Sequence, residues 1–365
     1  MATRELKPPE PVRWWVLATL FALALVLVPV PGWIVEELYS RDTYPWLQNL
    51  LTTATNVLPF ALLDVLLAAA AVAAAYRAVR LLNVMRQRGI IDAVWEAVRR
   101  VIRFAAVLVI LFCWAWGFNY RRTSIESGLP GGSAVRPTVD LLQLAVADAN
   151  ALAARLRPLT IAARQPTYTE LADALVPQMN RALEALGRPA LARGGRPKYS
   201  FVLAPFFTAA GVTGMINPLG LESIVSAELL PYEQPFVLAH EWAHLAGNAD
   251  EAEASAVGWL ACMQGDARFA YSASLYLIME ATAKLPAAEH RASWARLDPG
   301  VRSDIEAILE RTRRQRPAVQ RTTSRVYGEY LRANRVADGT ASYGRALALI
   351  LSPTLREALS SYDGK

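Results

Sequence analysis

Three apolar segments in the first third of the chain constrain the fold more than any other feature. They cover residues 14–30, 58–76 and 101–118, and each approaches the ~20 residues that a helix needs to cross a bilayer. Tryptophan and tyrosine side chains gather near their ends, as is typical of helices anchored at membrane interfaces. Because apolar residues make up 54% of the whole chain, we expect three transmembrane helices with the lipid bilayer as a partner.

The middle segment leaves a second interpretation open. It is rich in alanine, so it could instead be a buried helix of a soluble protein. Its single charge, Asp64, lies near one end. A charge inside a span is costly, whereas a charge near the end of a span can reach the interface. We therefore expect an interfacial role for Asp64.

The distribution of arginine predicts the orientation in the membrane. Residues 77–103 contain seven arginines against two acidic residues, whereas the loop between the first two segments has one arginine against three acidic residues. Positively charged loops stay in the cytoplasm, and Arg121 and Arg122 argue only weakly the other way. We predict a multi-pass protein of the cytoplasmic (inner) membrane, with residues after about 120 outside the cytoplasm. The first segment lacks a small-x-small cleavage site and should stay as an anchor.

Charge and cysteine content argue against a nucleic-acid-binding protein and against a disulfide-rich protein. The arginine-rich loop, seven positive against two negative charges, accounts for most of the net charge of +6. The rest of the chain has no basic patch with interleaved aromatic residues, so we expect no nucleic-acid partner. The two cysteines are Cys113, inside an apolar segment, and Cys262, in a predicted buried helix. They form no disulfide framework.

The remainder of the chain predicts a helix-dominated α+β domain with a small β-sheet. We place a membrane domain at residues 1–120, a linker at 121–137 and an extracytoplasmic domain at 138–365. Thr167 and Glu170 form a capping box at the start of one helix. The β-prone runs 199–203 and 222–227 could bind an extended peptide or form a plain structural hairpin. Helices are predicted at residues 138–157, 167–186, 251–264, 266–285, 301–315, 323–334 and 343–351.

Two of the three histidines in the chain belong to one HExxH motif, His240–His244. Residues i and i+4 of a helix share a face, so both imidazoles can bind one Zn²⁺, and Glu241 can take a proton from a metal-bound water. The alternative is a chance motif on an amphipathic helix. Pro235 suits the first turn of this helix and Gly247 its end. Asn248 and Glu251 then fit a capping box that opens a second helix.

The third zinc ligand is a choice among three carboxylates. Asp250 completes a metzincin-like spacing, whereas Glu251 starts a Glu-x-x-Ala sequence like that of gluzincins. Glu253 lies about 200° from Glu251 around a helix, so the two cannot face one metal ion. We choose Glu251, with Asp250 second, and interpret the remaining acids as favourable charges at a helix N-terminus.

Several blocks together resemble the bacterial membrane family called domain of unknown function 3810. They are MINPLGLE (215–222), PF (235–236), HEWAHLAG (240–247), EAEA (251–254), YLRAN (330–334) and DGTASYGR (338–345). The resemblance covers nearly the whole chain and implies a zincin-like metallopeptidase domain behind three N-terminal spans. One departure is Ser255, where family members usually carry Asn. A serine hydroxyl can still orient a metal ligand, but its reach is shorter.

These features predict a membrane-anchored, gluzincin-like zinc metallopeptidase that cleaves peptide or protein substrates outside the cytoplasm. His240, His244 and Glu251 would hold the metal and Glu241 would act as base. Two alternatives stay open: a zinc hydrolase acting on a cell-envelope amide or ester, and a zincin-fold binding or assembly protein without catalysis. The C-terminal block shared with the family supplies Tyr343 as a candidate catalytic donor, with Arg345 beside it; the alternative is core packing. His290 fits a surface residue.

Overall fold

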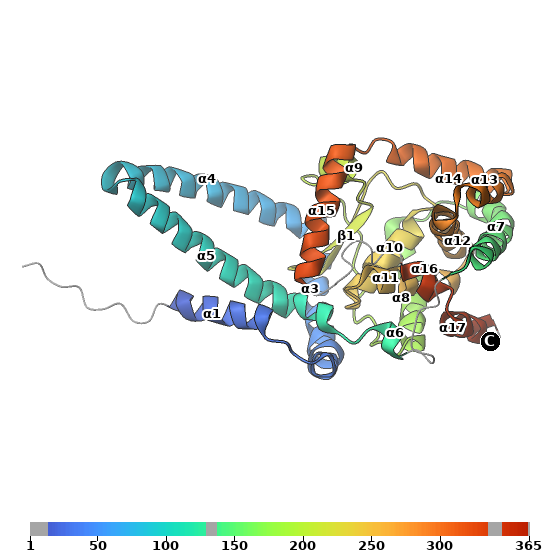
Figure 1. The fold of residues 1–365 in the computed structure, drawn as a ribbon, viewed down its shortest axis with the longest axis horizontal. Coiled ribbons are helices and arrows are strands. Elements are labelled where there is room, and N and C mark those ends of the chain that lie inside the picture. Colours follow the sequence, from blue (N-terminus) through green and yellow to red (C-terminus); the bar gives the residue numbers. More distant parts are fainter. Residues whose placement is uncertain (1–13, 129–136, 335–344, 364–365) are drawn as a thin grey trace, which may run out of the picture.

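The computed structural model describes residues 14–128, 137–334 and 345–363. A helical hairpin and one further helix project from one side of a globular body (Figure 1). The helices and strands are α1 (Trp14–Leu27), α2 (Gly32–Ile34), η1 (Val35–Thr43), α3 (Tyr44–Asn56), α4 (Leu62–Arg88), α5 (Ile90–Ala115), η2 (Gly117–Arg121), α6 (Ile125–Gly128), α7 (Val139–Ala162), α8 (Tyr168–Ala185), α9 (Ala204–Ala210), β1 (Gly214–Asn217), β2 (Glu222–Val225), α10 (Gln234–Leu245), α11 (Glu251–Met263), α12 (Ala267–Lys284), α13 (Ala287–Ala295), α14 (Pro299–Thr312), α15 (Pro317–Ala333), α16 (Ala346–Ile350) and α17 (Pro353–Asp363).

The projecting helices correspond to the three apolar segments, but only one of them is a clear span. Within the described residues, α4 alone is long and apolar enough to cross a membrane by itself, over Leu62–Gln87. The first and third segments qualify only as helix pairs bent by 111° and 67° at a break. The structure therefore supports a membrane protein and confirms one membrane-spanning candidate rather than three.

The arginine-rich stretch predicted as a loop is helical instead. Helices α4 and α5 run through it and are separated only by Gly89, whose φ of 92° is a conformation that favours glycine. Arginine is a good helix former, so a charged stretch needs no loop. The arginines consequently lie along the far half of a long hairpin, away from the globular body (Figure 1).

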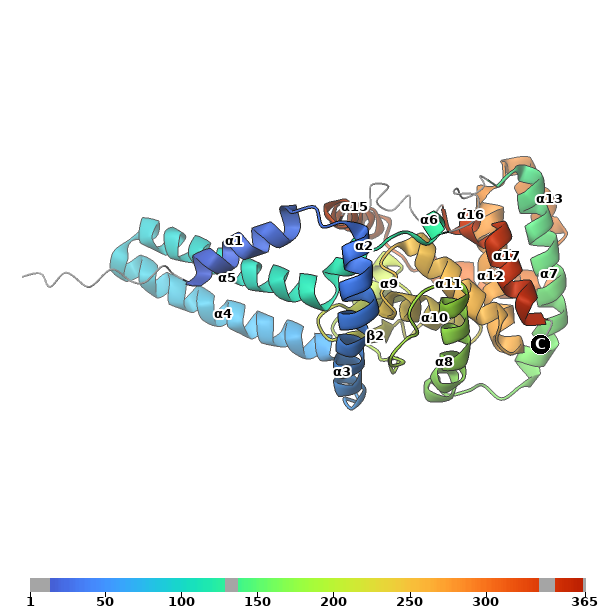
Figure 2. The same cartoon turned by 90° about the horizontal axis from the view of Figure 1, so that it is seen from below.

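Residues 32–56 belong to the globular body, although the sequence placed them in the membrane domain. They form α2, η1 and α3, which run across the base of the hairpin (Figure 2). The hydroxyl of Tyr44 donates to the Leu245 carbonyl at 2.9 Å, and Thr52 Oγ1 donates to the Leu221 carbonyl at 2.7 Å. Both side chains are buried, so a boundary at residue 120 does not separate the membrane part from the core.

The sheet is small, as expected, but one of its two predicted strands is wrong. Strands β1 and β2 pair antiparallel, with Gly214 opposite Val225. Residues 199–203 form a turn that leads into α9, because Ser200 Oγ accepts from the Leu203 amide and Pro205 starts the helix. Lys198, just before this turn, forms an isolated bridge to β2, opposite Ile224.

Most of the predicted helices are present. The capping box of Thr167 and Glu170 is confirmed at the start of α8, and Pro177 lies inside that helix. Helix α17 was not predicted, and α15 begins six residues earlier than expected, at Pro317. Proline favours the first turn of a helix, and sequence periodicity alone did not reveal that start.

The core is built around α10 and α11, which are buried among α8, α12 and α16. The two central helices approach closely at Gly258, where an added Cβ would lie 2.9 Å from the His240 amide nitrogen. Trp242 is fully buried on the other side of α10 and donates its Nε1–H to the Gly195 carbonyl at 2.9 Å. A small residue at the crossing thus sets how near the second helix comes to the histidines.

A buried carboxylate joins α4 to the sheet. Glu222 on β2 accepts from the amides of Leu62 and Leu63 at 3.0 and 2.9 Å, which caps the start of α4. Lys198 Nζ lies 2.9 Å from the same carboxylate, and both side chains are almost fully buried. The first turn of the membrane helix is therefore tied directly to the strands.

We predict that Glu222→Gln destabilises the folded protein strongly, because it leaves the Lys198 ammonium buried without its counter-ion. Breaking such a pair costs about 3–5 kcal/mol, so the unfolding midpoint in detergent should fall by about 10 °C. The matched control is Glu310→Gln, which removes an ion pair with Arg313 at the surface and should change the midpoint by less than about 2 °C. Equal midpoints for the two variants would contradict this account of α4.

Candidate metal centre

Helix α10 presents both histidines because its two ends are well defined. Pro235 lies in the first turn, as predicted. At the other end Gly247 has a φ of 86°, its amide donates to the His244 carbonyl at 2.7 Å, and the Asn248 amide donates to the Ala243 carbonyl at 3.1 Å. This pair of hydrogen bonds is a Schellman motif, which stops the helix and reverses the chain. The following helix can then return past His240 and His244.

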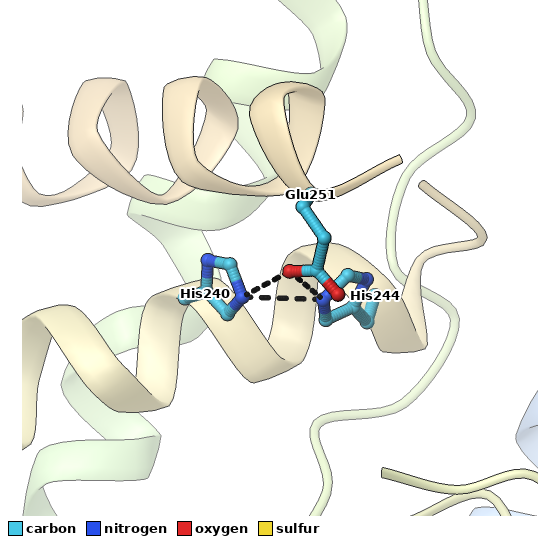
Figure 3. A group of neighbouring side chains, drawn as sticks. All are labelled: His240, His244 and Glu251. Carbon is cyan, nitrogen blue, oxygen red and sulfur yellow. Dashed lines mark hydrogen bonds and ion pairs between the residues drawn. The ribbon is translucent and has the colours of Figure 1, made fainter. Parts of the chain in front are cut away.

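Asp250 is the N-cap of helix α11, so the predicted cap at Asn248 is wrong. The Asp250 carboxylate accepts from the amides of Ala252 and Glu253 at 2.9 and 3.2 Å. Asn248 instead donates its side-chain amide to the Ala243 carbonyl at 2.9 Å and completes the turn. Glu251 is consequently the first residue of α11 and faces α10 (Figure 3).

The structure brings His240, His244 and Glu251 together, as Figure 3 shows. Each histidine Nε2 lies 3.3 Å from Glu251 Oε2, and the two Nε2 atoms are 3.1 Å apart. Ligands about 2.0–2.1 Å from a tetrahedral Zn²⁺ lie about 3.3 Å from one another. Two nitrogens and one carboxylate oxygen at this spacing could hold a metal ion and keep a fourth position open.

The other two carboxylates have different partners. Asp250 Oδ2 lies 2.6 Å from an Arg345 guanidinium nitrogen, in addition to capping α11. Glu253 pairs with the buried Arg188 at 3.1 Å and accepts from the Ile125 amide at 2.8 Å. Of the three candidates, the structure therefore turns only Glu251 toward the histidines.

Hydrogen bonds also fix the polar atoms of these three residues that point away from the centre of the cluster. His244 Nδ1 lies 2.7 Å from the Asn248 carbonyl, so it is the donor and leaves Nε2 as the nitrogen free to bind a metal ion. His240 Nδ1 lies 3.3 Å from Ser255 Oγ, so the serine at this position does reach a candidate metal ligand. The Tyr327 hydroxyl donates to the second oxygen of Glu251. Each ring and the carboxylate is thus held in one orientation.

Burial and mutual charge shift the pKa values of this cluster in opposite directions. Burial lowers the pKa of both histidines, but the Glu251 carboxylate and the Asn248 carbonyl raise the pKa of His244 to about 9. For His240 the effect of burial is larger than that of Glu251, so its pKa is lowered. Glu251 is stabilised as an anion by the two histidines, which hold its pKa well below the usual range despite burial. A metal ion bound to His244 Nε2 would replace this proton and would likewise supply positive charge beside the Glu251 anion.

Glu241 lies against strand β1. An added Cβ at Gly214 would be 2.5 Å from Glu241 Oε1, so only a glycine lets the strand pass this carboxylate. Oε2 is buried and has no hydrogen-bond partner among the described residues. Burial raises the pKa of Glu241 to about 8, His244 lowers it and Glu251 raises it. A carboxylate with this pKa can both take up and release a proton near neutral pH.

Aromatic residues from distant parts of the chain form one wall of the cluster. The ring of Trp116, directly after α5, lies 6.3 Å from that of His244. Tyr330 on α15 contacts Tyr120 and Phe112, with ring centroids 5.9 and 6.1 Å apart. No spacing in the sequence indicated these residues or Tyr327, because each comes from another helix. The end of α5 therefore reaches the candidate metal centre.

Two of the remaining candidates from the sequence, Arg345 and His290, are not at the cluster. Tyr343 lies outside the described residues, so its predicted role stays a prediction. Arg345 is paired with Asp250 at the start of α11 rather than with the histidines. His290 contacts the Thr282 carbonyl at 2.9 Å and stacks on Trp294.

Residues 39–351 match the family described as protein of unknown function (DUF3810). The chain belongs to this family. The match confirms the resemblance drawn from the HExxH block and from the C-terminal block of the DUF3810 chain. No curated protein and no solved structure matches the chain.

We predict that the three carboxylates of this DUF3810 protein differ sharply in their effect on zinc binding. Glu251→Gln should weaken the binding of added Zn²⁺ by at least ~100-fold, because it removes one of three ligands. Asp250→Asn keeps a side chain that can cap α11, and Glu253→Gln acts away from the histidines, so both should bind zinc nearly as the wild type does. Calorimetric titration of the three variants tests this, and zinc lost in Asp250→Asn but kept in Glu251→Gln would contradict it.

Proposed function

We propose that the protein is a membrane-anchored, gluzincin-like zinc metallopeptidase that cleaves peptide bonds outside the cytoplasm. The observation that carries this proposal is the cluster of His240, His244 and Glu251, with the unpaired carboxylate of Glu241 beside it. Structural zinc sites have four protein ligands and need no adjacent base, whereas catalytic sites keep one position open. Three ligands and a neighbouring carboxylate support catalysis over a scaffold role.

The residues around the cluster fit a bound metal ion. The Asn248 carbonyl and the Ser255 hydroxyl contact the outer nitrogens of the two rings, which is the usual support of metal-binding histidines. The side chains of His240 and His244 remain 16% and 11% exposed, so substrate can reach them. Zinc, when bound there, would supply a Lewis acid for the scissile carbonyl and for water.

Glu241 would serve as general base and then as general acid. Its buried, unpaired Oε2 can accept the proton of the attacking water and pass it to the departing amine. The pKa of about 8 comes from burial without zinc, and a nearby cation would favour the anion that the base step needs. Gly214 keeps the strand close without displacing this carboxylate.

Strand β1 favours a peptide over a small envelope amide or ester. In the described part of the chain it pairs only with β2, so its other edge presents backbone groups that an extended substrate can pair with. Gly214, Met215 and Ile216 are partly exposed along this edge. Because Gly214 contacts Glu241, a peptide paired with β1 would have its backbone beside the proposed base.

The orientation inferred from the arginines is compatible with the fold. The tip of the hairpin near Gly89 and the globular body lie at opposite ends of α4 and α5 (Figure 1). If α4 crosses the cytoplasmic membrane, the arginine-rich tip and the cluster lie on opposite sides. The positive-inside rule then gives an extracytoplasmic catalytic domain.

We predict that metal binding and hydrolysis can be separated by substitution. His240→Ala and His244→Ala should each lose zinc and activity, because two ligands bind zinc far more weakly than three. Glu241→Gln should keep one zinc per chain and lose peptide hydrolysis by about 10²–10⁴-fold. Zinc content and cleavage of a peptide library, measured on the same samples, test this. Full hydrolysis by Glu241→Gln would remove this residue as the base.

Topology gives an independent prediction. An alkaline phosphatase fused after Lys365 should be active, since that enzyme works only outside the cytoplasm, whereas the same enzyme inserted at Gly89 should be inactive. A cytoplasmic reporter at the two positions should show the reverse pattern. Activity of the phosphatase at Gly89 alone would place the catalytic domain inside the cell.

A further inference from the structure

The stretches of the projecting helices between the globular body and the nearest arginines are shorter than the hydrocarbon core of a bilayer. On α4 the first arginine after Leu62 is Arg77, and on α5 the last arginine before Ala115 is Arg103. At 1.5 Å per residue these stretches measure about 22 and 18 Å, against a hydrocarbon core of about 30 Å. Arginine side chains can extend toward the head groups on their own side, so α4 as a whole is long enough to cross the bilayer. The surface of the globular body at the start of α4 then lies close to the opposite head groups.

An exposed apolar segment lies on that side; it consists of the turn at residues 199–203 and the start of α9, and we call it the loop. Residues 199–207 carry no charge, and Phe201 is 81% exposed, Val202 53% and Phe206 40%. The loop is fixed beside the first turn of α4, because the Phe201 amide donates to Asp64 Oδ2 at 2.8 Å and the Ser200 hydroxyl donates to Oδ1. Its aromatic side chains thus start at the level where the apolar part of α4 begins.

We propose that residues 199–207 enter the head-group region of the bilayer that α4 crosses, and that the natural substrate is a polypeptide segment emerging from that bilayer. The substrate class rests on the proposed peptidase function, whereas the docking of the loop does not. Partly exposed aromatic residues are favoured at this depth of a membrane. With Phe201, Val202 and Phe206 in the interface, the exposed apolar surface of the loop is removed from water.

The candidate catalytic cluster lies close to the same level. Glu222, which caps Leu62, also accepts from Asn217 at 3.0 Å, and β1 leads from Asn217 back to Gly214 beside Glu241. Four residues of strand span about 10 Å. On the other side Trp116, one residue beyond α5, packs against His244. One helix of the hairpin is thus tied to the strand beside Glu241, and the other ends next to a ring that packs on His244.

The position of the cluster near the membrane surface favours one class of substrate. A chain that leaves the bilayer is extended near the surface and is already held at the height of β1, so its effective concentration at the site is raised by tethering. A soluble peptide of the same sequence has no such advantage and must also approach past the head groups. The juxtamembrane segment of a membrane-anchored protein is thus the substrate that the geometry favours.

The docking of the loop can be measured without any hydrolysis. Both native cysteines are buried, so Phe201→Cys in the full chain can be labelled selectively with an environment-sensitive fluorophore and reconstituted in phosphatidylcholine vesicles. We expect blue-shifted emission and strong quenching by brominated lipid. The control is Leu159→Cys, a 62% exposed position that should stay unquenched, because its helix α7 lies on the side of the body away from the hairpin (Figure 1). Equal, water-like emission from both positions would overturn the docking.

The substrate class is tested with one peptide in two forms, soluble and anchored by a transmembrane helix in the same vesicles. We expect kcat/KM to be at least ~10-fold higher for the anchored form, and the ratio to fall toward one in Phe201→Ser/Val202→Ser. The control Leu159→Ser/Ile161→Ser should keep the wild-type ratio. Equal cleavage of both forms by the wild type would overturn this substrate class and leave the peptidase proposal intact. Cleavage of neither form would count against the peptidase, and the fluorescence would still decide the docking.

Discussion

Four buried charges form the interaction on which the part of the structure around His240, His244 and Glu251 depends. Arg122 lies 2.9 Å from Glu36, and Arg188 lies between Glu36 and Glu253, at 3.4 and 3.1 Å. All four side chains are less than 10% exposed. Charges taken out of water are tolerated only with partners, so none of the four can be lost without leaving another unpaired. The network therefore holds η1, η2, the turn after α8, and α11 in one arrangement.

This network also decides which acid faces the histidines. Arg188 draws Glu253 to the far side of α11, and Asp250 is occupied as the helix cap. Arg122 contacts the carbonyls of Ala246 and Gly247 at 3.3 and 3.2 Å and so stabilises the turn between the two central helices. Glu251 is the acid left to meet His240 and His244. Ion pairing outside the cluster thus leaves Glu251 as the carboxylate that could serve as a metal ligand.

The membrane helices and the cluster are parts of one unit rather than an anchor and a separate domain. Glu222 and Asp64 fix the start of α4 to the strands and to residues 199–207. The end of α5 reaches His244 through Trp116. A domain on a flexible linker could work at any distance from the bilayer, whereas these contacts keep the cluster at a fixed height. Such rigidity suits an enzyme whose substrate is presented by the membrane.

Local patterns in the sequence were sufficient for features that depend on neighbouring residues. The spacing of His240 and His244 predicted a shared helical face, Gly247 predicted the end of that helix, and Thr167 with Glu170 predicted the start of α8. Each of these is set by backbone geometry within about one helical turn. The sequence also singled out Glu251, and the structure places this carboxylate beside the two histidines, because a helix that starts at residue 251 separates it from Glu253 by about 200°.

Only the tertiary structure decided which distant groups meet. Residues 32–56 lie in the globular core because Tyr44 and Thr52 find buried carbonyl partners more than 160 residues away. The turn at residues 199–203 replaces a strand because Asp64 takes its amide and hydroxyl groups, and Tyr327 reaches Glu251 from a helix 76 residues further on. A periodic pattern reports which face of an element is apolar but not which element covers it. Long-range pairing of buried polar groups is specified by their combined geometry, which exists only once the chain has folded.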